Sequence, residues 1–544
     1  MTDWRCTGYA DRAAPGLESG EQRDTTNEGN DGYARARVTS GRRRPRSSPR
    51  PIGAQGAARN KPAPIVAALL MVTAMVTAAP LAAQTPRAAP LERQRVIVLS
   101  DIEADPDDTQ SFVRLLLYAN QIDLEGLVAT TSVHMKASTH PESIRRVIQA
   151  YARVQPNLAK HEAGFPKAER LAALVSEGQP GYGMAAVGAN KDTAGSRLII
   201  QALERDDPRP LWISAWGGVN TLAQALHTIR ETRSPEATRR LIARLRVYTI
   251  SDQDDSGAWI RRAFPELFYV VSPGGYGAGT WTGIHTSIEG GDNRTISNSW
   301  LRENIQQGHG PLGAVYPDVA YGMEGDTPAF LSLIPNGLSV PEHPDWGGWG
   351  GRYELYTPAL AVTDPSGFTG GVPIEPETRP IWTNAIDAFT PWVARDLGRA
   401  NTPAERSIKD FRAGIWRWRD DIQNDFAARM DWTTRPFAEA NHPPEVRLAH
   451  ADHLTVRSGQ RFVLSAVGST DPDGDSLSFQ WLHYQEIGHW QSAIPNGIAA
   501  NIHTVDFTAP AVTAPREAHF IVRVTDKGAP PLTRYKRVIV TITP

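Results

Sequence analysis

The chain has 544 residues and a formal net charge of −2, so its composition gives no electrostatic reason to bind a polyanion, and we expect no nucleic-acid partner. Its one cysteine, Cys6, lies near the N-terminus. Once the first 83 residues are removed, as argued next, no thiol remains. This excludes a disulfide framework, a cysteine nucleophile and a zinc–thiolate site. Stability must then come from a large hydrophobic core, for which the chain is long enough.

The first two segments do not resemble parts of a folded domain. Residues 1–60 are rich in Arg, Gly and Ser, which predicts disorder or an upstream extension. Residues 61–83 begin with a lysine, continue with an apolar run from Ile65 to Val76 and end in small residues, the pattern of a secretory signal peptide cleaved after Ala83. The run is shorter than the about 20 apolar residues of a membrane span. We expect a periplasmic or secreted protein with no membrane span after cleavage.

Residues 91–365 alternate between short apolar runs and helical patterns. This alternation predicts an α/β domain with a mainly parallel sheet and helices on both of its faces. The expected strands are residues 96–99, 124–130, 211–215, 247–250 and 268–271. The expected helices are residues 110–118, 141–151, 196–205, 220–229, 235–245 and 257–264.

The first expected strand ends in an acidic loop, with five carboxylates in eight positions: Asp101, Glu103, Asp105, Asp107 and Asp108. Ligands of open α/β sheets bind at the carboxyl ends of the strands. A hard divalent cation such as calcium would offset the repulsion between these side chains and take their oxygens as ligands. The alternative is a solvated acidic loop that stabilises the N-terminus of the following helix.

The spacing Asp101-x-Glu103-x-x-x-Asp107-Asp108 resembles the N-terminal signature of the nucleoside hydrolases, Asp-x-Asp-Pro-Gly-x-Asp-Asp. The resemblance implies a bound calcium ion with Asp101 and Asp108 as ligands. It also implies that Glu103 is both a ligand and the general base for the attacking water, and that Asp107 contacts a sugar hydroxyl. Two departures are a Glu at position 103 and Ala-Asp in place of Pro-Gly. The longer side chain shifts the expected base, although a reacting geometry must hold to about 0.5 Å.

Two later strand ends extend this resemblance. The segment from Trp216 to Asn220 is similar to the family's Gly-Pro-Leu-Thr-Asn segment, in which a main-chain carbonyl is a calcium ligand. Asn220 falls on that position. A plain glycine turn before a helix is the alternative. Gln253 and Asp254 follow the next strand, where the family carries contacts to the sugar. For these two residues, N-capping of the helix that starts near Gly257 is the alternative.

The segment around Asp326 resembles the His-Asp-Pro segment that closes the calcium site of the family, which places Asp326 at the last ligand position. Gly325 stands where many members carry a histidine that helps a purine leave. This departure argues against an ordinary purine nucleoside as the substrate. Glu324, His309 and His285 remain candidates for protonating the leaving group, and the sequence does not select one.

Several tryptophans are candidates for sugar binding. Trp216 lies in the glycine-containing segment described above, and Trp346 and Trp349 lie in a second glycine-rich segment, residues 346–354. An aromatic ring offers a flat apolar face on which a sugar can stack. The alternative is that these rings fold back into the core of the domain.

The end of the chain has a different pattern. Residues 366–440 predict a helical linker, in which apolar residues at a spacing of three and four form an amphipathic helix over Glu405–Met430 packed on the α/β domain. Residues 441–544 show alternating apolar positions separated by turns, which predicts an immunoglobulin-like β-sandwich with Trp481 in its core.

Four blocks together resemble a family of exported proteins that have a nucleoside-hydrolase-like domain and are described as cellulose-binding. The resemblance covers most of residues 95–544 and implies a carbohydrate or nucleoside-like ligand, with plant-wall polysaccharide as a further partner. A fold by itself does not establish an activity. The blocks are residues 101–108, 253–255 with 257–260, 324–328 with 334–338, and 416–419 with 423–426.

The sequence therefore predicts an exported, calcium-dependent glycosidase that hydrolyses an N-glycosyl or related bond. In this prediction Glu103 takes a proton from the attacking water, and Asp107 with Gln253 or Asp254 orients the sugar. The alternative is a non-catalytic, cellulose-binding protein with the same fold, in which Trp346 and Trp349 hold a polysaccharide.

Overall fold

The computed structural model describes residues 93–272, 279–359, 372, 375–393, 402–403, 407–488 and 498–544. The expected extension and signal peptide lie outside these residues, as do parts of the expected linker. Within the described part of the chain, none of the helices combines the length and apolar character that crossing a membrane requires.

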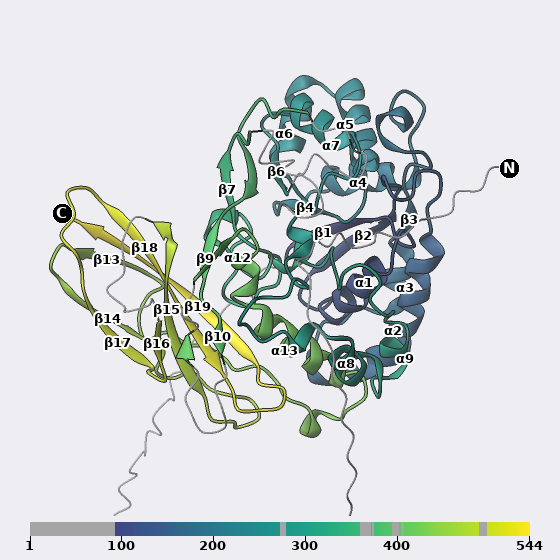
Figure 1. Ribbon diagram of the computed structural model, residues 1–544. Coiled ribbons are helices and arrows are strands. Elements are labelled where there is room, and N and C mark those ends of the chain that lie inside the picture. Colours follow the sequence, from purple (N-terminus) through teal and green to yellow (C-terminus); the bar gives the residue numbers. More distant parts are fainter. Residues whose placement is uncertain are drawn as a thin grey trace, which may run out of the picture. The chain divides into compact units, whose positions relative to one another are not determined.

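An eight-stranded sheet forms the centre of the α/β part (Figure 1). Its strands are β1 (Arg95–Ser100), β2 (Asp123–Ala129), β3 (Val175–Glu177), β4 (Leu211–Ala215), β5 (Leu245–Thr249), β6 (Phe268–Val271), β7 (Tyr353–Tyr356) and β8 (Ile381–Asn384). The strand order is β3-β2-β1-β4-β5-β6-β8-β7, and β7 alone among them runs antiparallel to its neighbour. The predicted, mainly parallel sheet is confirmed.

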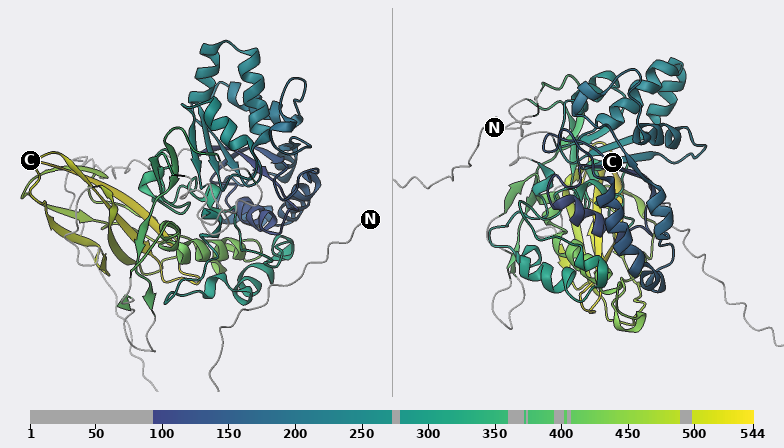
Figure 2. Two further views of the ribbon diagram at one scale, coloured as in Figure 1. Left: turned by 45° about the horizontal axis from the view of Figure 1, so that its top comes forward. Right: turned by 90° about the vertical axis from the view of Figure 1, so that its right-hand side faces the viewer.

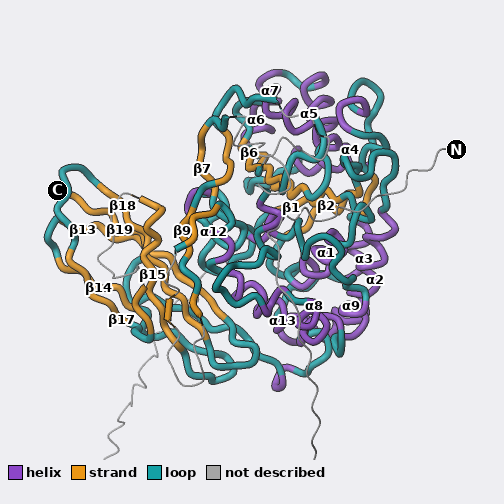
Figure 3. The backbone as a smooth tube through the Cα atoms, viewed as in Figure 1, coloured by secondary structure: helices purple, strands orange, loops and turns teal. Residues whose placement is uncertain are grey.

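Helices cover both faces of this sheet, as Figure 3 shows in purple around the orange strands. The longer helices are α1 (Asp107–Leu117), α2 (Pro141–His161), α3 (Ala168–Ala173), α4 (Ala194–Glu204), α5 (Asn220–Thr232), α6 (Pro235–Ala243) and α7 (Ser256–Ala263). Side chains alternate along β1: Val96 and Val98 pack in one core with α1 and α2, while Ile97 and Leu99 pack in another with α4 and α5. This double burial explains why β1 reads as an uninterrupted apolar run.

Short helices fill the connections after β6. The α-helices are α8 (Asn298–Leu301), α9 (Gly310–Ala314) and α10 (Pro328–Leu331). One turn is a π-helix, η4 (Arg302–Gln306). The 3₁₀ turns of the described chain are η1 (Gly183–Ala186), η2 (Thr280–Thr282), η3 (Arg294–Ile296), η5 (Pro344–Trp346) and η6 (Phe437–Glu439).

The prediction of one helix over Glu405–Met430 is wrong. The chain instead forms β12 (Ile408–Asp410), paired with β9 (Asp387–Phe389), and then the separate helices α12 (Ala413–Trp416) and α13 (Arg419–Asp431). The carboxylate of Asp410 accepts the backbone N–H of Arg412 at 2.8 Å. This local bond competes with helix formation and ends the strand in a turn. A further small pair joins β10 (Trp392–Val393) and β11 (Thr402–Pro403).

The C-terminal strands form two sheets around one apolar core, which confirms the predicted all-β domain. The strands are β13 (His453–Arg457), β14 (Arg461–Ser465), β15 (Ser478–Gly488), β16 (Ile498–Ala500), β17 (Thr504–Thr508), β18 (Arg516–Thr525) and β19 (Thr533–Thr543). One sheet has the order β13-β19-β18-β15-β16, and β14 pairs with β17. Trp481 is fully buried in this core, as predicted.

Helix α13 lies between the α/β part and these β-strands (Figure 2). Ile422 packs in the core of the α/β part. On another side of the helix, the carboxylate of Asp421 accepts from Arg523 at 2.7 Å and that of Asp425 from Arg534 at 2.6 Å. Because 11 of its 13 residues are buried, α13 is not the predicted amphipathic helix with one solvent-exposed face.

Candidate functional site

The acidic loop lies at the carboxyl end of β1 and lines a cavity of about 630 Å³. Loops that follow β2, β4 and β5 contribute His134, Trp216 and Gln253 to its lining, and Trp281 and Tyr321 come from the segment after β6. Parallel strands bring their carboxyl ends to one edge of the sheet, which is why residues distant in sequence meet here. The volume is in the range of about 300–1,000 Å³ that is typical of small-molecule sites.

Two glycines after β4 let the loops of the site pack closely. A Cβ atom on Gly217 would lie 2.6 Å from Oδ1 of Asp101, and one on Gly218 would lie 2.5 Å from the carbonyl oxygen of Thr131. Both distances are too short for a side chain to be accommodated. The glycine pair is therefore required by the close approach of the acidic loop as well as by the turn.

Six aspartates line the cavity, and four of them, Asp101, Asp107, Asp108 and Asp326, are the candidate metal ligands. One oxygen atom each of Asp107, Asp108 and Asp326 lie within 4.8 Å of one another. Asp108 accepts a hydrogen bond from the Ser100 hydroxyl. The Oδ2 atom of Asp326 is buried and has no hydrogen-bond partner among the described residues.

Burial makes these carboxylates difficult to ionise in the absence of a cation. It raises the pKa of Asp101 to about 7, and a hydrogen bond to Ser132 offsets only part of this effect. Burial also raises the pKa values of Asp107, Asp108 and Asp326 well above their usual range, and repulsion between the carboxylates adds to the shift. A cation among the four groups would offset both costs.

The donor set fits a hard divalent ion. Every candidate ligand atom in the group is a carboxylate oxygen, which calcium and magnesium prefer over nitrogen or sulfur. The buried, unpartnered oxygen of Asp326 would gain a partner from such an ion. Asp101, Asp107, Asp108 and Asp326 are thus the residues that could hold it.

The structure does not bring Glu103 into this cluster. Glu103 has a φ of 81°, and its carboxylate accepts from the hydroxyl of Ser143 on α2 and lies 3.5 Å from the guanidinium of Arg146. Its side chain is 42% exposed, and it is not among the described residues that line the cavity. The position expected to carry the base and a metal ligand therefore points to α2.

Asp105 lies in the cavity where Glu103 was expected. Its Oδ1 atom accepts the backbone N–H of Asp107 at 2.9 Å, and its negative charge helps to raise the pKa of Asp101. The sequence comparison missed this residue because Asp105 replaces the glycine of the signature, a position that has no assigned role. The sequence feature that could have identified Asp105 is the presence of a carboxylate where the signature has a glycine.

Of Asn220, Gln253 and Asp254, the described lining of the cavity includes only Gln253. Its amide nitrogen donates to the main-chain carbonyl of Trp216. Asp254 is buried and accepts the backbone N–H groups of Asn220 at 3.0 Å and Ser256 at 2.9 Å, at the starts of α5 and α7. For Asp254, the structure thus agrees with the helix-capping alternative. The side chain of Asn220 donates to Thr131, and Asn220 is not among the described residues that line the cavity.

The three predicted tryptophans lie in different surroundings. Trp216 is a buried part of the cavity lining and packs on Phe112, with 4.7 Å between ring centroids. Trp349 is fully buried and donates to the Tyr535 hydroxyl at 3.2 Å. Trp346 is half-buried and stacks on His343 at 3.9 Å. Neither Trp346 nor Trp349 is among the described residues that line the acidic cavity. Since Trp349 is fully buried, it agrees with the alternative that these rings fold back into the core.

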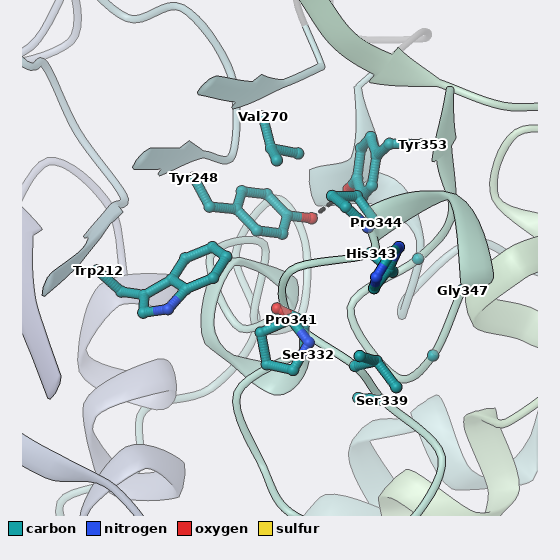
Figure 4. A pocket seen from close by; sticks show the side chains of 13 residues that line it. Trp212, Tyr248, Val270, Ser332, Ser339, Pro341, His343, Pro344, Gly347 and Tyr353 are labelled. Carbon is teal, nitrogen blue, oxygen red and sulfur yellow. Dashed lines mark hydrogen bonds between the residues drawn. The ribbon is translucent and has the colours of Figure 1, made fainter. Parts of the chain in front are cut away.

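The glycine-rich segment 346–354 borders a second pocket, shown in Figure 4. This pocket has a volume of about 20 Å³ and is lined by Tyr248, His343 and Tyr353 among others. A water molecule needs about 10–15 Å³ of such volume. The pocket therefore holds about one water and has no room for a sugar.

None of the three expected proton donors is among the described lining residues of the acidic cavity. Glu324 is fully buried in an ion pair with Arg114. His309 is buried and lies 3.1 Å from Asp431. His285 packs beside Trp281, with 5.3 Å between ring centroids. His134 is the imidazole that lines the cavity within the described part of the chain.

The fold and this site define an α/β domain of the nucleoside-hydrolase type, joined to a C-terminal all-β domain. Residues 95–353 match the family model for the cellulose-binding Sde182 nucleoside hydrolase-like domain, and residues 461–542 match that for the C-terminal domain of the cellulose-binding protein Sde0182. A solved structure of a nucleoside hydrolase-related protein from Saccharophagus degradans, associated with carbohydrate metabolism, is 35% identical with a TM-score of 0.67. The match covers 83% of this chain and 100% of that one. The chain belongs to this cellulose-binding, nucleoside-hydrolase-like family, as its motifs predicted.

Two further solved structures match more weakly. The effector protein XOO4466 is 13% identical with a TM-score of 0.26, and the effector XopQ in complex with adenosine diphosphate ribose is 14% identical with a TM-score of 0.20. Each match covers 54% of this chain and 88% of the other. These scores are too low to support an inference about the site. A search of curated proteins found no match.

Proposed function

We propose that this protein is an exported, calcium-dependent hydrolase that cleaves a glycosyl bond in a sugar-containing substrate. The convergence of four carboxylates in one cavity of small-molecule size is the observation that carries this proposal. The family's description as cellulose-binding, and the relative's association with carbohydrate metabolism, support a carbohydrate ligand. The predicted signal peptide supports export to the periplasm or the medium.

In this proposal Asp101, Asp107, Asp108 and Asp326 hold the calcium ion. When bound, calcium supplies a fixed positive charge that attracts the oxygens of sugar hydroxyls and of water. The carboxylates also place negative charge next to the sugar, where it favours the positive charge that develops at the anomeric carbon. The residues of the chain thus contribute by binding and orienting the reactants.

Asp105 is the proposed general base. It lines the cavity and is partly buried, whereas the carboxylate of Glu103 is held by Ser143 on α2. In the reaction, the oxygen of water bonds to the anomeric carbon and one proton of that water passes to Asp105. The bond to the leaving group breaks, and the leaving group takes up a proton, for which His134, an imidazole in the cavity lining, is the candidate donor.

Gln253 is the proposed contact to the sugar, and Trp216 positions it. The Oε1 atom of Gln253 is buried with no hydrogen-bond partner among the described residues, so a sugar hydroxyl could donate to it. The amide nitrogen of the same side chain is fixed by the carbonyl of Trp216, which sets the direction of the oxygen. The indole ring of Trp216 is fully buried, so this residue acts on the sugar through its carbonyl, which holds Gln253 in place.

The test is sugar release from nucleosides, oligosaccharides and plant-wall polysaccharides, with calcium and with chelator. We expect release that requires calcium, and we expect Asp108→Asn and Asp326→Asn each to abolish calcium binding and release together. Glu236→Gln is a matched control, because this carboxylate is exposed on α6. Release that persists in chelator would contradict the proposal. If folded, calcium-loaded protein binds polysaccharide and releases sugar from none of the substrates, it is a non-catalytic binder.

A further inference from the structure

We infer that Trp281 and Tyr321 form an aromatic subsite for a second sugar unit at the mouth of the acidic cavity, so that the ligand is an oligosaccharide. This inference rests on the proposed function and names its substrate class. Both rings line the same cavity as the carboxylates. Tyr321 does not belong to the residues that the sequence predicted as sugar contacts.

The first observation is the close approach of Trp281 to the carboxylates. A Cβ atom on Gly325 would lie 2.4 Å from Oδ2 of Asp107 and 3.4 Å from Cε3 of Trp281. Because position 325 has no side chain, the Asp107 carboxylate and the indole ring of Trp281 both pack against the backbone of Gly325 and lie close to each other. A sugar whose hydroxyls reach Asp107 therefore has a flat apolar ring beside it.

The second observation is the exposure of Tyr321. Its side chain lines the cavity, yet the residue is 82% exposed, the highest value among the large hydrophobic residues of the described chain. The opposite end of the cavity, which carries the carboxylates, is buried, since Asp101, Asp108 and Asp326 are at most 4% exposed. Tyr321 thus lies at the open end. An exposed tyrosine ring at the edge of a polar cavity offers a sugar both an apolar face and a hydroxyl.

The third observation is the hydrogen-bonding character of the lining. It is rich in acceptors, because ionised carboxylates and the Oε1 atom of Gln253 accept hydrogen bonds and do not donate them. Sugars offer a hydroxyl donor on most ring carbons, whereas the ring nitrogens of a purine need a donor. The position that carries a histidine in many nucleoside hydrolases is Gly325 here. The lining therefore suits a ligand that has hydroxyls on both sides of the scissile bond.

The negative charge of the carboxylates in the lining also excludes ligands that carry a phosphate group. Asp101, Asp105, Asp107, Asp108 and Asp326 line one cavity together with Asp252, and one divalent cation cannot neutralise them all. A phosphate group would meet net negative charge at short range. The ligand of this subsite is thus a neutral carbohydrate rather than a nucleotide or a sugar phosphate.

The test is binding of cello- and xylo-oligosaccharides of one to four units, and of adenosine, to the calcium-loaded protein by titration calorimetry. We expect the disaccharide to bind about tenfold more tightly than the monosaccharide, equivalent to about 1.4 kcal/mol. Tyr321→Ala should remove this gain, and Tyr321→Phe should keep it because the ring is retained. Leu355→Ala is the control, since Leu355 is 54% exposed on β7 and is not a lining residue.

Equal affinities for one and two units in the unmodified protein, or an unchanged gain in Tyr321→Ala, would overturn the subsite. Tighter binding of adenosine than of every oligosaccharide would overturn it as well. These outcomes are separable from those of the hydrolase proposal. Calcium-dependent hydrolysis of a nucleoside with no effect of chain length would remove the subsite and keep the hydrolase, whereas Tyr321-dependent oligosaccharide binding without sugar release would support the subsite and remove the hydrolase.

Discussion

Arg114 of α1 and Glu324 form an ion pair in which neither side chain is exposed to solvent. The Nη2 atom of Arg114 donates to Oε1 of Glu324 at 3.0 Å, and the same guanidinium donates to Oε1 of Gln423 on α13 at 2.6 Å. Glu324 also accepts from the Tyr316 hydroxyl at 2.8 Å. Since Glu324 stands two residues before Asp326, this network fixes the backbone that carries the last carboxylate of the site.

Removal of Arg114 should therefore destabilise the protein strongly. In Arg114→Met, the Glu324 carboxylate would remain buried without its cation, which costs about 3–5 kcal/mol. Denaturant unfolding of the two proteins measures the difference. Arg240→Met is the control, because Arg240 pairs with Glu236 on the surface of α6 and such pairs contribute about 0.3–0.5 kcal/mol. Equal losses in the two variants would show that the buried pair has no special role.

Calcium should stabilise the protein against thermal unfolding. An ion that binds the folded state alone adds about 2.7 kcal/mol at a concentration of 100 times its dissociation constant. Asp326→Asn should lose this effect, because the amide removes one charge and one oxygen ligand from the cluster. Differential scanning calorimetry with calcium and with chelator gives the result. A calcium-induced increase of equal size in Asp326→Asn would mean that the ion binds elsewhere.

Glu103 and Asp105 can be compared directly as bases. We expect Asp105→Asn to lower the rate of sugar release by a factor of about 10²–10⁴, the usual contribution of a general base. Glu103→Gln should retain most of the rate, since Gln can keep the hydrogen bond to Ser143 outside the cavity. Initial rates on whichever substrate the panel identifies provide the measurement. The reverse order of the two variants would restore Glu103 to the role that the sequence comparison assigned to it.

Trp349→Ala should affect stability and leave carbohydrate binding unchanged. The ring is fully buried and packs on Tyr535, so its loss opens a cavity that costs about 3–5 kcal/mol. Pull-down on insoluble cellulose at a temperature where the variant is folded separates the two effects. Loss of binding by folded Trp349→Ala would support the polysaccharide-holding role that the sequence predicted for this residue.

The β-domain should be sensitive to acid. Burial, together with the nearby charges of Arg537 and His343, lowers the pKa of His519 to about 3. The folded state therefore binds fewer protons at this ring than the unfolded state, whose histidines titrate near pH 6.5. The stability that the neutral, buried ring of His519 contributes is present above about pH 6.5 and is lost as the pH falls from there toward about 3. His519→Phe should flatten this dependence in urea unfolding, whereas exposed His453→Phe should not. If the free energy of unfolding varied equally with pH in the two variants, His519 would not be the cause of the acid sensitivity.

Strands β1, β2, β4, β5 and β6 were predictable because they are largely buried on both faces and read as apolar runs, whereas the partly exposed β3, β7 and β8 were not predicted. β4 and β6 match their predicted bounds, and β1 and β5 differ by one or two residues. Asp101, Asp108 and Asp326 were found by motif, and the structure brings all three into one cavity.

Other features depended on packing that no local pattern contains. The placement of Glu103 follows from its positive φ and from Ser143 on α2, 40 positions away. The tryptophans could not be sorted by sequence, because Trp349 and Trp281 both lie near glycines and their burial is decided by distant elements. Helix α13 was misread because its polar residues are buried in ion pairs with strands about 100 residues further along the chain.

The position of α13 makes the C-terminal strands part of the α/β fold. Leu482, Tyr484, Ile521 and Tyr535 belong to the same apolar core as α1 and α2. Truncation before β13 would remove Arg523 from Asp421 and Arg534 from Asp425. A carbohydrate-binding module on a flexible linker can be transplanted between enzymes. Here the two halves are expected to be inherited, and engineered, only as a single unit.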